Sequence, residues 1–187
     1  MRLVPAVLTL ACAAALAGAC GPAGESSPEE EVVMEKTLKV QCAAFADGAA
    51  IPVKHTGDGD DVSPALSWAA GPEGTVSYAV VVDDPDAPGG TWVHWVIWNL
   101  ADTKLPERVP PAATGPGGSV QGKNSWRRAG YGGPKPPSGT HRYFFKVYAL
   151  DEPLALGADA RKEELLHAMR GHTLAYGELM GTYTHVK

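Results

Sequence analysis

The stretch SYAVVVDDPDAPGGTWVHWVIWNL, residues 77–100, predicts two strands joined by a rigid loop. Its first part, Ser77–Asp83, is rich in β-branched residues and is typical of a strand buried on both faces. The loop Asp84–Gly90 contains two prolines and two glycines, which interrupt the pairing of a sheet. The second strand, Thr91–Leu100, carries bulky apolar side chains on both faces, so we expect it to be central in a sheet.

The composition agrees with a turn-rich β protein. Among 187 residues there are 22 glycines and 16 prolines, and 44 % of the residues are hydrophobic. The absence of a Gly-x-y period excludes collagen, and the apolar fraction is too high for a fully disordered chain. Glycine and proline recur too often for a helical bundle. A net charge of −5 without a basic cluster disfavours nucleic acid as a partner.

The same patterns predict the remaining elements. Further strands are predicted at residues 37–45, 64–69, 141–150 and 181–186, and loops at 51–63 and 101–139. One helix is predicted to begin after Ala158 or Asp159 and to stop at Gly171, and a second helical turn is predicted at Thr173–Leu179. The fold class is therefore mainly β, with one or two helices near the C-terminus.

Residues 1–19 are typical of a signal peptide. Arg2 is followed by an apolar run, Leu3–Ala17, that is too short for a comfortable membrane span and ends in small residues. The sequence Ala17-Gly18-Ala19-Cys20 resembles a bacterial lipobox, so we expect cleavage before Cys20 and lipidation of this residue. Ordinary cleavage after Ala19, which would give a secreted protein, and an uncleaved anchor are the alternatives.

Residues 20–36 are small, polar and acidic, as in a flexible tether, and residues 37–187 are the predicted domain. This organisation predicts an exported, membrane-anchored lipoprotein of a bacterial cell envelope, or otherwise a periplasmic or secreted protein. If Cys20 is lipidated, we expect Cys42 to be a buried, inert thiol. A free Cys20 could instead pair with Cys42 in an oxidising compartment.

His94 is the titratable group within the second strand of the opening stretch. Strict alternation places His94 on the same face as Trp92 and Trp98. Such a histidine can simply be a hydrogen-bonded core residue. If the two strands are neighbours, however, the preceding loop brings the carboxylates of Asp84 and Asp86 near His94, although these residues could also serve the turn alone.

A second proline-rich loop, residues 132–139, leads directly into His141 and Arg142. Prolines in both loops would hold the wall of a binding site in shape. A histidine at the start of a strand beside such a loop is a second site candidate, although it could also be an ordinary surface residue.

Taken together, these motifs resemble the signature blocks of the phosphatidylethanolamine-binding protein family, in order and in rough spacing. The blocks are Asp84-Pro85-Asp86-Ala87-Pro88, Trp92-x-His94-Trp95 with Asn99, and Tyr131-Gly132-Gly133-Pro134-x-Pro136-Pro137-x-Gly139-x-His141-Arg142-Tyr143. Shorter motifs resemble the bacterial, Raf-kinase-inhibitor-like branch: Ser63-Pro64-x-Leu66-x-Trp68, Gly122-x-Asn124, Ala149-Leu150-Asp151 and Gly171-His172-x-Leu174-Ala175. The resemblance covers nearly the whole predicted domain.

The resemblance implies a β-sandwich with a large central sheet, a smaller sheet and one or two C-terminal helices. It also implies a small pocket for anions such as phosphate or a phosphorylated headgroup, without a cofactor, a metal or catalytic residues. Carried over by position, the ligand-binding residues are Asp84, Asp86, Pro88, Trp92, His94, Gly133, Pro134 and His141, with Trp92 as an apolar wall. Lys135 departs from the family, whose bacterial members often have cysteine there, and it places a cation near the pocket mouth.

Two carboxylates would repel an anion unless they accept hydrogen bonds from the protein. We expect Asp84 and Asp86 to accept them from His94 and His141, so that the imidazoles face the ligand as donors. Backbone N–H groups of the second loop could add further donors. Anion binding should then strengthen as the pH falls from about 8 to about 6.

Three other functions are compatible with the sequence. An acid–base enzyme could use these side chains, but no Gly-x-Ser-x-Gly motif or activated nucleophile is evident. A metal site could use Asp84, Asp86, His94 and His141, but no His-x-x-x-His or Cys-x-x-Cys spacing occurs. An interaction or inhibitor module of kinase or protease type could use the same pocket, and export would favour a cell-envelope partner over a cytoplasmic kinase.

Overall fold

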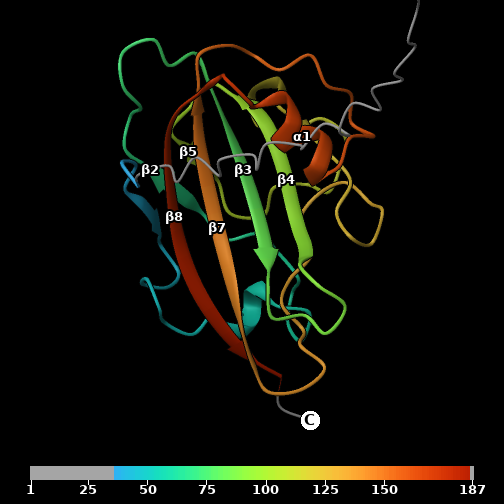
Figure 1. The fold of residues 1–187 in the computed structure, drawn as a ribbon. Coiled ribbons are helices and arrows are strands. Elements are labelled where there is room, and N and C mark those ends of the chain that lie inside the picture. The colour runs from blue at the N-terminus through green and yellow to red at the C-terminus, as the bar shows by residue number, and fades with distance from the viewer. Residues whose placement is uncertain (1–35, 186–187) are drawn as a thin grey trace, which may run out of the picture. The chain divides into compact units, whose positions relative to one another are not determined.

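The structure, a computed structural model, describes residues 36–185 (Figure 1). The predicted signal peptide, Cys20 and the tether up to residue 35 lie outside the described residues. The strands are β1 (Val40–Cys42), β2 (Leu66–Trp68), β3 (Ser77–Asp84), β4 (Trp92–Leu100), β5 (Lys104–Leu105), β6 (Val120–Gln121), β7 (Thr140–Leu150) and β8 (Thr173–Thr184). In this part of the chain the helices are α1 (Lys162–Ala168) and two 3-10 helices, η1 (Val53–His55) and η2 (Pro116–Gly118). None of these described helices is long and apolar enough to cross a bilayer.

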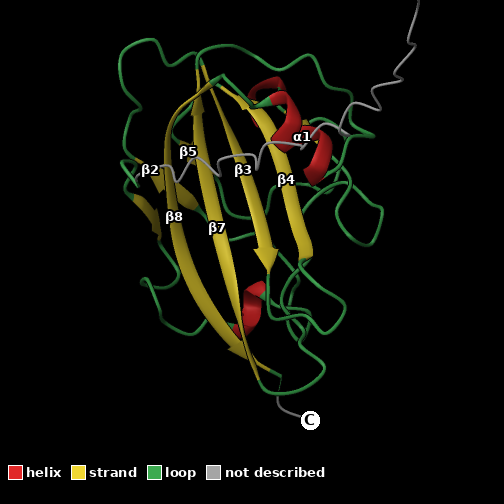
Figure 2. Cartoon of the chain, viewed as in Figure 1, coloured by secondary structure: helices red, strands yellow, loops and turns green. Residues whose placement is uncertain are grey.

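Two antiparallel sheets make up the fold (Figure 1, Figure 2). The larger sheet has the strand order β6-β4-β3-β7-β8, and the smaller sheet has the order β1-β2-β5. Apolar side chains of both sheets, among them Trp68, Trp95 and Phe145, share one buried cluster. A second cluster lies on the opposite face of the larger sheet, where α1 contributes Leu165. The predicted two-sheet, mainly β fold is therefore confirmed.

β3 is the central strand of the larger sheet, and all eight of its residues are buried. On the neighbouring β4, Leu100 lies opposite Tyr78 and Trp92 lies opposite Asp84. The strand predicted at Ser77–Asp83 differs from the observed β3 by one residue at its C-terminal end. The buried strand ends in two adjacent carboxylates, Asp83 and Asp84, which therefore need partners inside the protein.

The helical turn predicted at Thr173–Leu179 is wrong. These residues belong to β8, which pairs with β7 along almost its whole length. Buried residues in β8 alternate with more exposed ones, and this period of two is the signature of a strand. Gly177 and Gly181 both lie on the buried side and disfavour a helix.

The predicted helix begins later than expected. Its N-cap is Arg161 rather than Ala158 or Asp159, because the Glu164 side chain accepts a hydrogen bond from the Arg161 backbone N–H at 2.9 Å. The long connection between residues 101 and 139 contains β5, η2 and β6. These elements are too short to show a period in the sequence.

Cys42 lies on β1 as a free thiol that is only partly buried. Burial raises its pKa, against the opposing effect of the Ala44 backbone N–H, which donates to Sγ at 3.4 Å. A raised pKa keeps the thiol protonated, which agrees with the expected inert role although Cys42 is less buried than predicted.

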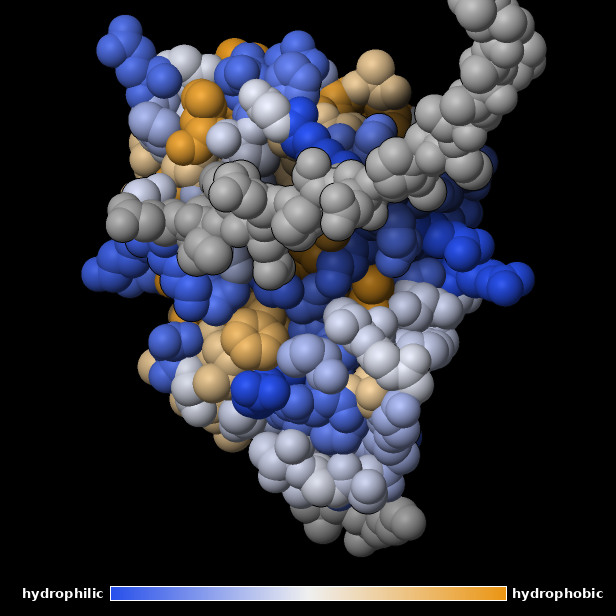
Figure 3. Space-filling model, viewed as in Figure 1, coloured by the Kyte–Doolittle hydropathy of each residue, from blue (hydrophilic) through white to orange (hydrophobic). Residues whose placement is uncertain are grey.

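The outward side of β7 and β8 carries polar groups between its aromatic rings. Lys36 forms an ion pair with Glu178 at 2.5 Å, and the rings of Tyr148 and Tyr176 lie 5.1 Å apart. Figure 3 shows hydrophilic residues over much of the described surface on this side, with smaller apolar areas between them. The solvent-facing side of these two strands is therefore mixed in polarity.

A substitution at Gly177 tests the packing of β8. A Cβ at this position would lie 2.1 Å from the carbonyl oxygen of Leu38, so Gly177→Ala must displace the segment before β1. We expect the free energy of unfolding in urea to fall by about 3 kcal/mol. Gly157→Ala is the matched control, since nothing lies within 4 Å of its Cβ. Equal stability of the two variants would contradict this packing.

Candidate functional site

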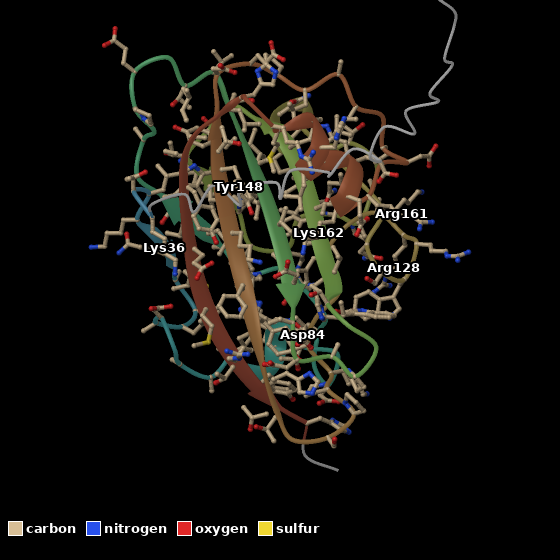
Figure 4. The ribbon with its side chains drawn as sticks, in the orientation of Figure 1. Lys36, Asp84, Arg128, Tyr148, Arg161 and Lys162 are labelled. Carbon is tan, nitrogen blue, oxygen red and sulfur yellow. The ribbon has the colours of Figure 1, made fainter. Side chains whose placement is uncertain are left out.

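A cavity of about 250 Å³ lies at one end of the larger sheet, where β3 ends and where β4 and β7 begin. Figure 4 shows Asp84 at this end of β3. The lining residues are Asp84, Ala87, Pro88, Trp92, His94, Trp126, Lys135, Pro136, Pro137, His141 and Tyr143. Five of the eight predicted ligand-binding residues are among them: Asp84, Pro88, Trp92, His94 and His141.

Asp84 and His141 form a buried hydrogen-bonded pair in the cavity wall. Asp84 is 4 % exposed and His141 is 7 % exposed. The Nδ1–H group of His141 donates to Oδ2 of Asp84 at 2.7 Å, and the backbone N–H of Asp86 donates to Oδ1 at 2.8 Å. These bonds fix the imidazole and leave its Nε2 as the ring nitrogen available to a ligand. The expected bond from His141 to a loop carboxylate is present.

A β-bulge on β4 turns His94 toward the cavity. The register between β3 and β4 shifts near the end of β3, and His94 is the extra residue, without a partner on β3. Its ring packs edge-on against Tyr143, with 5.2 Å between ring centroids, in a region whose core cluster also contains Trp95. The strict alternation that placed His94 with Trp98, a member of the opposite cluster, is therefore wrong.

The imidazole of His94 binds a backbone carbonyl instead of the expected carboxylate. Its Nδ1 lies 2.5 Å from the carbonyl oxygen of Gly132, and because that oxygen can only accept, Nδ1 carries the proton. Burial lowers the pKa of His94 below its ordinary value of 6.5, against the opposing effects of Gly132 and Asp84. The neutral ring therefore presents Nε2 as an acceptor, and this atom has no hydrogen-bond partner within residues 36–185.

The hydroxyl of Tyr143 is a further polar group at the cavity. Tyr143 is 1 % exposed, and among the described residues its hydroxyl has no hydrogen-bond partner. Burial, together with the nearby Asp84 carboxylate, raises the pKa of Tyr143 well above its ordinary value. The hydroxyl therefore stays protonated, but it is closed off from solvent and lies behind the accessible wall of the cavity.

Asp86 lies beside the cavity rather than in its wall. Arg142 donates from Nε to Oδ2 of Asp86 at 2.9 Å and from Nη2 to Oδ1 at 2.7 Å, and its backbone N–H also donates to Oδ2. These bonds hold the pKa of Asp86 at about 2. Asp86 thus ties the first loop to β7, and it has no bond to His94 or His141 in the described structure.

Gly133 and Pro134 lie behind the cavity wall. The backbone N–H of Gly133 donates to Oδ1 of Asp61 at 2.5 Å, and the N–H of Gly57 donates to the Pro134 carbonyl at 2.8 Å. A Cβ on Gly133 would lie 2.7 Å from the Thr56 backbone, so this close approach requires glycine. From the second loop, the cavity is lined instead by Lys135, Pro136 and Pro137.

The residues that line the cavity but were not among the predicted ligand-binding residues, apart from Lys135, are Ala87, Trp126, Pro136, Pro137 and Tyr143. Tyr143 follows His141 by two residues on β7, so the period of a strand could have identified it. Trp126 lies in an irregular loop, where no period applies. Its ring is T-shaped to Trp92 at 5.3 Å and to His94 at 5.1 Å, so two partly exposed indoles form the rim of the cavity.

Asp83, the neighbour of Asp84, belongs to the opposite face of the larger sheet. Its buried carboxylate pairs with Nζ of Lys146 at 2.9 Å and with Lys162 at the start of α1. Figure 4 shows Lys162 and Asp84 at separate places along the sheet. The two carboxylates therefore have different roles: Asp83 joins α1 to the sheet, and Asp84 belongs to the cavity.

The cavity combines a few polar groups with apolar walls. Nε2 of His94 accepts a hydrogen bond, and Nε2 of His141 donates one when its ring is protonated. Indole and proline rings line much of the remaining wall. Within the described residues, no group of three or more His, Cys, Asp or Glu side chains is placed to hold a metal ion. This arrangement fits a small polar ligand that both donates and accepts hydrogen bonds.

Comparisons with known proteins match this chain to one family. A family profile described as "Phosphatidylethanolamine-binding protein" matches residues 41–184. A UPF0098 protein of Methanothermobacter thermautotrophicus is 49 % identical over 148 residues, which cover 78 % of this chain and 98 % of the relative. The structure of a phosphatidylethanolamine-binding protein homolog from Chlamydia trachomatis matches with a TM-score of 0.74 and 37 % identity, over 81 % of this chain and all of that chain. E. coli YbcL, described as a member of the mammalian PEBP family, matches with a TM-score of 0.74 and 33 % identity, over 80 % of this chain and 99 % of its own.

The neutral state of buried His94 predicts a loss of stability in acid. The unfolded chain takes up a proton on this histidine near pH 6.5, whereas the native protein takes it up only at lower pH. The free energy of unfolding should therefore fall as the pH drops below about 6.5, by up to about 1.4 kcal/mol per pH unit. Urea unfolding of wild type and His94→Asn at pH 7.5 and pH 5.5 measures this effect.

We expect His94→Asn to show the smaller loss, because its amide does not titrate and can still donate to Gly132. His167→Asn, a substitution at an exposed histidine on α1, is the matched control and should keep the wild-type pH dependence. Identical pH dependence in all three proteins would contradict a neutral His94.

Proposed function

The chain belongs to the phosphatidylethanolamine-binding protein family, and we propose that it binds a small phosphorylated anion in its cavity. Family membership points to a binding protein. The ligand class is phosphate or a phosphorylated headgroup. The supporting observation is the pair of groups in the cavity wall, Nε2 of His94 and Nε2 of His141, that no described protein group occupies.

The proposed ligand satisfies each of these groups. A monoprotonated phosphate donates its hydroxyl proton to Nε2 of neutral His94, and another of its oxygens accepts from Nε2 of His141 when that ring is protonated. The Asp84 carboxylate does not exclude the anion, because both of its oxygens already accept N–H groups. Its role in this proposal is to orient the His141 ring so that Nε2 faces the ligand.

A protein partner is the second candidate for the same site. Trp92 is 38 % exposed and Trp126 is 43 % exposed, and aromatic side chains at the edge of a small cavity are common in protein interfaces. In this alternative the protein is an inhibitor or interaction module, including one of kinase or protease type. A side chain of its partner would pack against these rings. Catalytic turnover is less well supported, since neither serine nor cysteine lines the cavity.

We also propose that the protein is exported and held at a membrane of the bacterial cell envelope through a lipid on Cys20. The support is the sequence: an apolar run after Arg2, the lipobox-like Ala17–Cys20 and the acidic segment that follows. In this arrangement residues 20–36 connect the lipid to the binding domain. Ligands present in the cell envelope would then reach the cavity.

Titration calorimetry with inorganic phosphate and with phosphoethanolamine tests the ligand. We expect saturable binding by the wild-type protein, weakened by at least about tenfold in His94→Ala and in Asp84→Asn. His94→Ala removes an acceptor, and Asp84→Asn leaves one acceptor oxygen where two are needed for the Asp86 N–H and for His141 Nδ1, so the His141 ring loses its orientation. His172→Ala is the matched control, because this histidine is remote from the cavity, and its binding should be unchanged.

Circular dichroism and urea unfolding of each variant separate a lost ligand contact from a lost fold. Failure of the well-folded wild-type protein to bind either compound would remove the anion proposal and leave the protein-partner alternative. Equal binding by wild type, His94→Ala and Asp84→Asn would place any anion outside this cavity.

Lipidation is tested by metabolic labelling with an alkyne fatty acid in a bacterial host. We expect the wild-type protein to carry the label and to sediment with membranes, because Cys20 is the residue to be acylated. Cys20→Ser should lose the label, whereas Cys42→Ser should keep it. A label that persists in Cys20→Ser would contradict this assignment.

A further inference from the structure

Lys135 reaches the cavity but keeps its charge outside it. The side chain is one of the lining residues and is about half exposed. Its stem lies close to Gly57, where a Cβ would come within 3.1 Å of the Cβ of Lys135. Its Nζ lies 3.1 Å from Oδ1 of Asp58 and 3.5 Å from the Gly57 carbonyl oxygen. The ammonium group is therefore directed to the loop beside the cavity.

Asp58 does not depend on Lys135. The Tyr183 hydroxyl donates to Oδ2 of Asp58 at 2.8 Å, and Nδ1 of His185 lies 2.6 Å from the same oxygen. Hydrogen bonds from His185, Tyr183 and Lys135 together hold the pKa of Asp58 at about 2. If Lys135 left, the carboxylate would keep two partners, so the cost of releasing this lysine is small.

Arg142, a second cation close to the cavity, is held far more firmly. It binds Asp86 through two side-chain hydrogen bonds in a fork geometry, at 2.9 Å and 2.7 Å. A lysine on a flexible stem can exchange one partner for another, whereas a bidentate arginine would have to break both bonds. Among the residues that line the cavity, Lys135 is therefore the lysine or arginine that can turn to a bound ligand.

The charge of the cavity wall determines which ligands gain when Lys135 leaves Asp58. Asp84 contributes a negative charge, and His94 is neutral at ordinary pH. Protonated His141 would only balance Asp84. A ligand with one negative charge can be bound by these groups, but a second negative charge needs a further cation.

We propose that Lys135 selects ligands with a terminal phosphomonoester, by leaving Asp58 to pair with the second negative charge of a bound dianion. This inference rests on the proposed anion site and names its substrate class. A phosphodiester carries a single negative charge and gains little from Lys135. A monoester is a dianion above its second pKa of about 6, so the selection operates at pH 8, where the ammonium group of an ethanolamine ester, in place of a phosphate hydroxyl, donates to Nε2 of His94.

Calorimetry at pH 8 with phosphoethanolamine, a monoester, and glycerophosphoethanolamine, a diester with the same ammonium group, tests the proposal. We expect the wild-type protein to prefer the monoester by about tenfold or more. Lys135→Met should lose most of this preference while binding the diester as before, and Lys135→Arg should keep part of it. Asp58→Asn should bind the monoester at least as tightly as wild type, because Lys135 is released.

Lys39→Met is the matched control, since it removes one exposed positive charge away from the cavity. An unchanged preference in Lys135→Met, or the same loss in Lys39→Met, would overturn the role of Lys135 while the anion site stands. Binding of neither ester by the wild-type protein would overturn the site and this inference together. Short-chain sphingosine phosphate, a lipid monoester that also carries an ammonium group, distinguishes a lipid source from a soluble one, and its binding should depend on Lys135 equally.

Discussion

The burial of β3 along its whole length is the constraint on which the rest of the structure depends. A strand that ends in two buried carboxylates must provide partners for both, since an unpaired buried charge costs several kcal/mol. The period of two sends Asp83 and Asp84 to opposite faces. Asp83 recruits two lysines and with them α1, whereas Asp84 recruits His141 and the first loop. The position of α1 on the sheet and the structure of the cavity wall therefore both follow from the need to pair a buried carboxylate at the end of β3.

The loop between η1 and β2 supports the second wall of the cavity without lining it. Asp61 accepts the Gly133 N–H group, and Asp58 accepts from the C-terminal end of β8 and from Lys135. Asp61 itself has a φ of 56°, a left-handed conformation that is uncommon outside glycine. Such strain is stable only where surrounding contacts impose it, and here the imposed conformation directs a carboxylate at the loop next to the ligand groups.

The sequence identified the strands whose burial pattern is strong, namely β3, β4 and the part of β7 beyond His141. It also identified the two loops that meet at the cavity, because their prolines and glycines interrupt the pairing of strands. It identified the end of β8, within the strand predicted at residues 181–186, but failed at residues 173–179, where small and aromatic residues hid a period of two. It also failed at His94, where a bulge reversed the expected face. Partners could not be predicted either: Asp86 bonds to Arg142, 56 residues away, and Trp126 reaches the cavity from an irregular loop. Such choices depend on tertiary geometry, which local patterns do not contain.

The distribution of the five tryptophans has an optical consequence. Trp68, Trp95 and Trp98 are buried in the two cores, whereas Trp92 and Trp126 are partly exposed at the mouth of the cavity. The fluorescence of the buried indoles should be blue-shifted and should change little when a ligand binds at the mouth of the cavity. The red-shifted fluorescence comes from the two exposed indoles, of which Trp126 lies beside His94. Any molecule that enters the cavity changes the solvation of those two rings, and a proton gained by His94 would quench one of them. The protein therefore contains its own fluorescent reporter of occupancy, without a label.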